Sequence, residues 1–273
     1  MKQQPIGIFD SGYGGLTVLK EITAKLPQYD YIYLGDNARS PYGTRSFETV
    51  YEYTLECVKW LFEQGCTLVV LACNTASAKA LRTIQQNDLP KIDASKRVLG
   101  VIRPTTELIG RFTKTGNVGI LATNGTVISN SYPIEIQKFY PKLNVFQQAC
   151  PMWVPLVENN EYNNPGADYF IQKNINDLLS QSSQIDTILL ACTHYPLLIE
   201  KIRKAVPTGM TILSQGEMVA ESLQAYLSRH TEIEENCSKN GQLSFFTTDS
   251  TEDFDNHAAI FYGKPVKSAH LRL

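Results

Sequence analysis

The 273-residue sequence has none of the features that would place the protein in a membrane, on a nucleic acid or outside the cell. It has no apolar run near the roughly 18–20 residues that a membrane-spanning helix needs. Its first five residues are polar and lead directly into a strand-like segment, without the pattern of a secretory signal. The formal net charge is −2 and no basic amphipathic stretch occurs, which argues against nucleic acids and membranes as partners. We therefore expect a cytoplasmic protein.

Signatures of bound metals and nucleotide cofactors are missing as well. No Cys-X-X-Cys pair occurs and the four histidines are scattered, so the spacing of a zinc site is absent. The segment SGYGG after Asp10 resembles a dinucleotide-binding loop, but Thr17 stands where the third glycine of GxGxxG should be. A phosphate-binding loop of the GxxxxGK[ST] type is also absent. We expect neither a metal nor a cofactor.

The six cysteines are too sparse, in a chain without an export signal, to indicate a disulfide framework. Free cysteine is usually a small buried hydrophobe. That interpretation suffices for Cys57, Cys66, Cys150 and Cys237. Cys73 and Cys192 differ from these four, because polar residues follow each of them directly after an apolar run.

Short apolar runs alternate with helical patterns along the whole chain, which is typical of parallel sheets covered by helices. Ser46 is a suitable N-cap for a long amphipathic helix, and Thr75 or Ser77 is expected to cap the helix after Cys73. Strands are expected at residues 5–10, 29–35, 98–102, 117–122, 211–213 and 243–248, with an edge strand within 266–273 and a further strand before each of the two cysteines. Helices are expected at residues 16–26, 47–64, 168–181, 218–227 and 251–262.

Two stretches, residues 67–81 and 186–200, repeat the same pattern of apolar run, Ala-Cys, two polar residues and helix. They align at an offset of 119 residues, and VGILATNG at residues 118–125 aligns with IGIFDSGY at residues 6–13 at an offset of 112. Two matches in the same order at nearly equal offsets indicate an internal duplication. We therefore expect two similar three-layer α/β domains with mainly parallel sheets and a site in the cleft between them.

The two Ala-Cys turns suggest a particular chemistry. A thiol at the start of a helix feels the positive end of the helix dipole, which favours the thiolate, and the backbone N–H groups there can hold a carboxylate. Two such turns place a base on either side of a cleft. Inverting a stereocentre requires this arrangement, because one base removes a proton from one face while the other delivers a proton to the opposite face.

At this point the sequence resembles the glutamate racemases, which belong to the cofactor-independent amino-acid racemases. The resemblance spans nearly the whole chain, and its segments occur in the family's order. The matching segments are GIFDSG at residues 7–12 with GGLTV at 14–18, Gly35-Asp36 with Pro41-Tyr42-Gly43, ACNTA at 72–76, GILAT at 119–123, VPLVE at 154–158 and ACTHYPL at 191–197.

The resemblance implies that Cys73 and Cys192 are the acid–base pair, with Cys73 acting on the D-enantiomer and Cys192 on the L-enantiomer. It implies that Asp10, Glu158 and His194 assist proton transfer. The alternatives are a helix cap for Asp10, a solvated carboxylate for Glu158 and a buried, hydrogen-bonded imidazole for His194. The residues that match substrate-binding positions are Asp10, Ser11, Tyr42, Gly43, Asn74, Thr75, Thr193 and His194.

The resemblance also implies domains that are discontinuous in sequence, with residues 1–98 plus 211–273 forming the first and residues 99–210 the second. It implies interconversion of L- and D-glutamate for peptidoglycan synthesis, no cofactor and a homodimer. The sequence departs from the family pattern at Arg103-Pro104-Thr105 and Ser214-Gln215-Gly216. Three alternatives remain open: a racemase for aspartate or another amino acid, a non-catalytic amino-acid-binding protein, and a thiol redox role.

Overall fold

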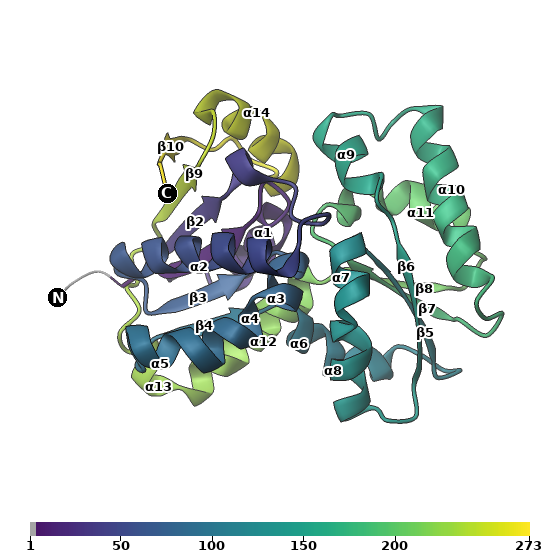
Figure 1. Cartoon of the computed structure of the whole chain (residues 1–273), viewed down its shortest axis with the longest axis horizontal. Helices are drawn as coiled ribbons and strands as arrows, with labels where there is room; N and C mark the ends of the chain where they lie inside the picture. The colour runs from purple at the N-terminus through teal and green to yellow at the C-terminus, as the bar shows by residue number, and fades with distance from the viewer. Residues whose placement is uncertain (1–3) are drawn as a thin grey trace.

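The computed structural model describes residues 4–273 and shows two lobes, each built on a parallel sheet (Figure 1). The first sheet has six strands in the order β10-β9-β2-β1-β3-β4, and all its pairings are parallel. Its strands are β1 (Ile6–Asp10), β2 (Tyr31–Gly35), β3 (Leu68–Leu71), β4 (Arg97–Gly100), β9 (Leu243–Thr247) and β10 (Ser268–His270). As expected, residues near the C-terminus add an edge strand, β10.

The second sheet has four parallel strands in the order β6-β5-β7-β8. Its strands are β5 (Asn117–Ala122), β6 (Asn144–Ala149), β7 (Thr187–Ala191) and β8 (Thr211–Leu213). Taken in chain order, these four strands are connected as β1 to β4 are in the first sheet, where the order is β2-β1-β3-β4. The fold of two similar, mainly parallel α/β domains is therefore confirmed, and Cys73 and Cys192 follow corresponding strands.

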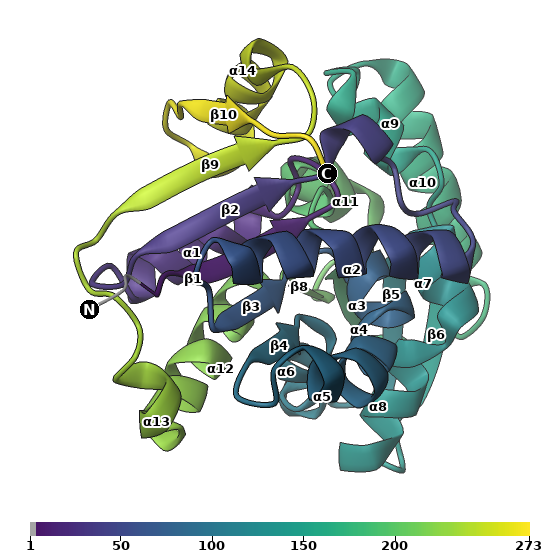
Figure 2. The ribbon, with the colours of Figure 1, turned by 60° about the vertical axis from the view of Figure 1, so that its left-hand side comes forward.

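Helices cover both faces of the first sheet, because its buried strands carry apolar side chains on both faces. Ile6 and Ile8 pack on one face and Phe9 on the other. The first face is covered by α1 (Leu16–Lys25), α12 (Gly216–Arg229) and α14 (Thr251–Tyr262), and the second by α2 (Phe47–Glu63) with α4 (Leu81–Thr83) and α5 (Leu89–Ile92). In Figure 2 the strands of this sheet lie between α2 and the C-terminal helices.

The second sheet has the same three layers. One face is covered by α9 (Trp153–Glu158), α10 (Pro165–Leu179) and α11 (Ile199–Ala205), and the other by α6 (Ile102–Thr106) and α8 (Ser131–Phe139). Between the lobes, α3 (Asn74–Lys79) packs against α7 (Asn124–Ser129). These two helices begin directly after strand ends, so they bring the carboxyl edges of both sheets together (Figure 1).

The chain passes from the first lobe to the second and later returns. Strand pairing places both of these crossings a few residues later than we expected. β4 continues to Gly100 in the first sheet, whereas we expected the second domain to begin at residue 99. β8 pairs with β7 in the second sheet, whereas we expected residue 211 to begin the return to the first domain. Both strands are short apolar runs next to a crossing, and only their hydrogen-bond partners decide to which sheet each belongs.

Some local expectations were wrong. Neither Thr75 nor Ser77 caps α3, because the sulfur of Cys73 itself accepts a hydrogen bond from the Ala76 N–H. The short helix α13 (Thr231–Glu234) lies outside the helices that we expected. Ser46 caps α2 as expected, accepting from the Thr49 N–H.

None of the helices in residues 4–273 has both the length and the apolar character that crossing a membrane requires.

Candidate active site

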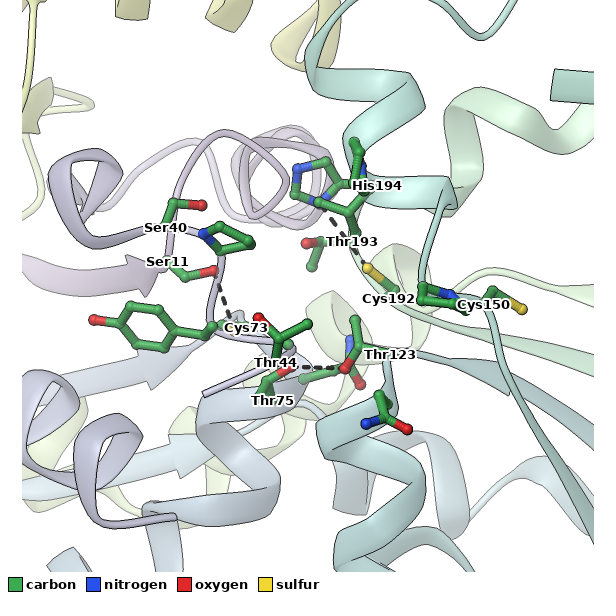
Figure 3. Close-up of a pocket in the computed structure, with 18 of the residues that line it drawn as sticks. Ser11, Ser40, Thr44, Cys73, Thr75, Thr123, Cys150, Cys192, Thr193 and His194 are labelled. Atoms are coloured by element: carbon green, nitrogen blue, oxygen red, sulfur yellow. Dashed lines mark hydrogen bonds between the residues drawn. The ribbon is translucent and has the colours of Figure 1, made fainter. Parts of the chain in front are cut away.

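A pocket of about 640 Å³, partly open to solvent, lies between the lobes, where the carboxyl ends of both sheets meet (Figure 3). Cys73 and Cys192 lie on facing sides of it, one from each lobe. Small-molecule sites often lie in such a position, at the interface between two domains. The predicted site residues that line it are Ser11, Tyr42, Gly43, Cys73, Asn74, Thr75, Glu158, Cys192, Thr193 and His194.

Cys73 lies two residues after the end of β3 and is the N-cap of α3. The sulfur accepts a hydrogen bond from the Ala76 N–H at 3.4 Å and lies 3.5 Å from the Ser11 hydroxyl oxygen. Burial raises the pKa of the Cys73 thiol to about 12, and the nearby Asp10 carboxylate adds to the increase. Without a ligand, Cys73 is therefore a protonated thiol at neutral pH.

Cys192 is surrounded by different groups. Its sulfur lies 3.9 Å from Nδ1 of His194, and Nε2 of the same ring lies 3.0 Å from Oε1 of Glu158. Burial lowers the pKa of His194, but its contacts with Cys192 and Glu158 raise it by more, to about 10. The ring is thus an imidazolium at neutral pH, and it places a positive charge beside this second sulfur. The two thiols therefore differ in environment, which suits one acid and one base.

The charge on His194 predicts a pH dependence of stability. Its pKa is raised from 6.5 to about 10 on folding, so the native state holds a proton that the unfolded state loses across this interval. The contribution is fully present below pH 6.5 and is lost as the pH rises towards 10. Glu158→Gln should shift this loss to lower pH, because the partner carboxylate is gone. Urea-unfolding midpoints of both proteins between pH 6 and 10 test this, and identical profiles would contradict it.

Asp10 lies behind the pocket wall and is not among the residues that line the pocket. Its side chain is buried, with Oδ1 accepting from the Gly12 N–H at 3.0 Å, and Oδ2 has no hydrogen-bond partner within residues 4–273. Burial raises the pKa of Asp10, and the positive charge of His194 opposes that increase. Asp10 does not cap α1, whose N-cap Gly15 has no side-chain cap.

Tyr42 lines the pocket, but its hydroxyl is engaged inside the loop. Its hydroxyl donates to Asp36 Oδ2, and this carboxylate also binds Arg39 Nε at 2.7 Å. The side chain anchors the loop and leaves only backbone groups for a ligand. The carbonyl of Gly43, the next residue, accepts a hydrogen bond from the Gly125 N–H at 2.8 Å, which ties the loop to the second lobe.

The loop after β1 packs directly against the Cys192 turn. Thr17 donates from Oγ1 to the Thr193 carbonyl at 3.0 Å. A Cβ atom at Gly14 would lie 2.3 Å from Thr193 Oγ1 and 2.5 Å from His194 Nδ1. Thr17, which breaks the dinucleotide pattern, therefore makes a contact between the lobes, and Gly14 allows the close approach. Nothing in the local sequence revealed either role.

Several residues that line the pocket were not predicted. Thr123 is the most informative of these, because Thr75 Oγ1 and Thr123 Oγ1 form a hydrogen bond of 2.9 Å across the cleft. The offset of 112 residues aligns Thr123 with Ser11, so the duplication already contained the signal. The other unpredicted lining residues are Ser40, Pro41, Thr44, Asn124, Cys150, Pro151, Val154 and Pro155.

Sequence and structure comparisons identify relatives of the whole chain. Residues 14–223 match the Asp/Glu/Hydantoin racemase family. The glutamate racemase of Geobacter metallireducens is 40% identical over 263 residues, covering 96% of this chain and 94% of the relative. The glutamate racemase of Persephonella marina is 37% identical over 271 residues, covering 98% of this chain and 97% of the relative.

Solved structures similar to this chain include glutamate racemases as well. A glutamate racemase isoform of Bacillus anthracis matches with a TM-score of 0.90 and 35% identity, covering 100% of this chain and 99% of that one. The glutamate racemase of Francisella tularensis in complex with D-glutamate matches with a TM-score of 0.87 and 28% identity. The match covers 100% of this chain and 98% of that one. With relatives similar along nearly its full length, the chain belongs to the Asp/Glu/hydantoin racemase family.

Proposed function

We propose that this protein is a glutamate racemase that interconverts L- and D-glutamate with two cysteine thiols as acid and base. The single observation that carries the proposal is the placement of Cys73 and Cys192 on facing sides of one pocket, at corresponding strand ends of the two lobes. A solved relative holds D-glutamate, and the curated relatives that match at 36–40% identity are glutamate racemases.

In the proposed reaction, L-glutamate binds with its Cα between the two sulfurs. The Cys192 thiolate removes the Cα proton from one face and becomes a thiol. The Cys73 thiol delivers its proton to the opposite face and becomes a thiolate, so D-glutamate forms without net gain or loss of protons. D-glutamate reacts in the reverse sense, with Cys73 as the base.

The surroundings of the two thiols support this assignment for the L-enantiomer. Cys73 starts as the protonated acid, since burial raises its pKa to about 12. The His194 ring lies 3.9 Å from the Cys192 sulfur, and its contact with Glu158 helps to raise the pKa of the ring to about 10, which places a positive charge beside this thiol. We propose that His194, Glu158 and Asp10 assist proton transfer at the two thiols.

We propose that the substrate is held by groups at the two cysteine turns and in the loop that contains Gly43. The first backbone N–H groups of a helix have no partner within the helix and can bind carboxylates. These groups come from Asn74 and Thr75 on one side and from Thr193 and His194 on the other, with the Ser11 hydroxyl between them. The backbone of Tyr42 and Gly43 completes the site.

Incubation with glutamate in deuterated water tests the function. Purified, reduced protein should place deuterium at Cα while L-glutamate converts to D-glutamate, followed by proton NMR and chiral chromatography. Binding without exchange would favour the non-catalytic alternative and overturn the proposal. Faster turnover of aspartate than of glutamate would favour the aspartate alternative, whose solved examples here share only 18–20% identity with this chain.

The remaining expectations are proposals that rest on the resemblance to glutamate racemases. We propose that the enzyme acts in the cytoplasm, supplies D-glutamate for peptidoglycan synthesis and forms a homodimer. We further propose two discontinuous domains, with strand pairing moving the crossings to about residues 100 and 214. A test of the thiol redox alternative is whether a Cys73–Cys192 disulfide can be trapped without distorting the fold, since all six cysteines are free thiols in this structure.

A further inference from the structure

A buried ring of three side chains joins the lobes directly behind the pocket. Asn74 Nδ2 donates to Gln215 Oε1 at 2.7 Å, Gln215 Nε2 donates to the Tyr132 hydroxyl at 2.7 Å, and that hydroxyl donates to Asn74 Oδ1 at 2.6 Å. Each member donates once and accepts once within the ring. All three side chains are at most 4% exposed, so water does not compete for these bonds.

One backbone carbonyl sets the direction of the whole ring. Gln215 Nε2 lies 3.3 Å from the Val101 carbonyl and 3.0 Å from Thr105 Oγ1, whose own hydroxyl donates to the same carbonyl. A carbonyl only accepts, so the amide nitrogen of Gln215 must face it and its oxygen must face Asn74. Asn74 must then present its nitrogen to Gln215 and its oxygen to Tyr132.

This order leaves one N–H of Asn74 without a partner within residues 4–273, and Asn74 lines the pocket. If Asn74 turned its amide over, two oxygens would face each other at Gln215. The ring therefore leaves a donor, not an acceptor, free on a residue that lines the pocket. A donor suits a carboxylate, and a hydrogen bond to a charged group is stronger than one between neutral groups.

We propose that Tyr132 and Gln215 are positioning residues that hold the Asn74 amide with its free N–H towards a substrate carboxylate. Tyr132 lies on α8 of the second lobe, Asn74 on α3 of the first, and Gln215 directly before α12 at the return crossing. The proposal deepens the proposed racemase function and rests on it. It also gives a role to Gln215, which lies in one of the two departures from the family pattern.

Tyr132→Phe removes the ring hydroxyl and keeps the buried aromatic packing. Asn74 Oδ1 then loses its donor, and the amide is free to turn. We expect KM for both enantiomers to rise about tenfold, because the loss of one well-oriented bond to a carboxylate is of that size. We expect kcat to change much less, since neither thiol is touched.

Thr105→Val is the matched control. It also removes one buried hydroxyl that accepts from Gln215 Nε2, but the Thr105 hydroxyl makes its hydrogen bonds with Gln215 and the Val101 carbonyl and none with Asn74. Both variants should lower the melting temperature, whereas only Tyr132→Phe should raise KM. Equal KM values in the two variants would overturn the proposal, because the ring would then be purely structural.

The Asn74→Ala background provides a second test. Once the amide is absent, adding Tyr132→Phe should not raise KM further; a further tenfold increase would show that the effect bypasses Asn74. If Tyr132→Phe does not fold, Gln215→Met tests the same ring and should raise KM, and an unchanged KM would overturn the proposal. Wild-type protein and Thr105→Val must racemise glutamate in these assays, and failure of both would refute the proposed function instead.

Discussion

Cys73→Ala and Cys192→Ala should each reduce kcat/KM for racemisation by at least about 10³-fold, because in the proposed mechanism each removes a group that transfers a proton in every turnover. With only one thiol left, a proton can be taken from one face but not delivered to the other. Both directions of the reaction should fail together, since each enantiomer needs one thiol as base and the other as acid. Chiral chromatography of glutamate incubated with each variant measures the loss.

The residual chemistry of these variants distinguishes the two thiols. Any deuterium exchange at Cα that survives in Cys73→Ala should be confined to L-glutamate, and any that survives in Cys192→Ala to D-glutamate. Cys57→Ala is a suitable control, since Cys57 is equally buried but lies outside the pocket. A fully active Cys73 or Cys192 variant would remove that thiol from the mechanism, and exchange of both enantiomers in one variant would show that a single base serves both faces.

Gly14→Ala should lower kcat/KM by about 100-fold, because a displacement of about 1 Å at a catalytic group can cost that much. The new methyl group would lie 2.3 Å from Thr193 Oγ1 and 2.5 Å from His194 Nδ1, well inside van der Waals contact. His194 is held by Glu158 at 3.0 Å and is 4% exposed, so the ring has little room to move away. The turn that carries Cys192 must then shift away from the first lobe.

Gly12→Ala is the matched control for this prediction. Gly12 lies in the same loop, but a methyl group there would approach Ser40 Oγ no closer than 3.4 Å and Glu158 Oε1 no closer than 3.6 Å, which is ordinary contact. We expect Gly12→Ala to retain nearly full activity, and steady-state kinetics on both enantiomers compare the two variants. Equal activities would mean that the close approach of the lobes at Gly14 is not needed for catalysis.

Much of the fold was predictable because its signals are local. Buried parallel strands are continuous apolar runs, and the repeat of Ala-Cys after two of them revealed corresponding positions in two domains. The other match, at an offset of 112 residues, also aligned Thr123 with Ser11, although we did not draw that inference from the sequence. The crossing points were harder to predict, because β4 and β8 are short and only their pairing partners assign them to a sheet.

The side-chain directions at the site were not predictable in the same way. Tyr42 follows a motif that suggests a ligand, yet its hydroxyl is held by Asp36 on the opposite side of the loop. Asp10 ends a strand at the cleft, yet it lies behind the wall. In both residues the backbone position follows from the local pattern, whereas the orientation depends on what packs around it.

The sequence by itself determined two parallel α/β domains, the positions of Cys73 and Cys192 at equivalent turns, and the chemistry that two opposed thiols allow. These conclusions depend on the period of apolar residues within short segments and on the likeness of one segment to another. Both can be seen in the sequence without knowing which segments pack together. Only the tertiary structure decided that Gly14 lies against His194 and that Tyr132 and Gln215 close a ring on Asn74. Those contacts join residues from 58 to 180 positions apart, and they exist only once the two lobes have docked.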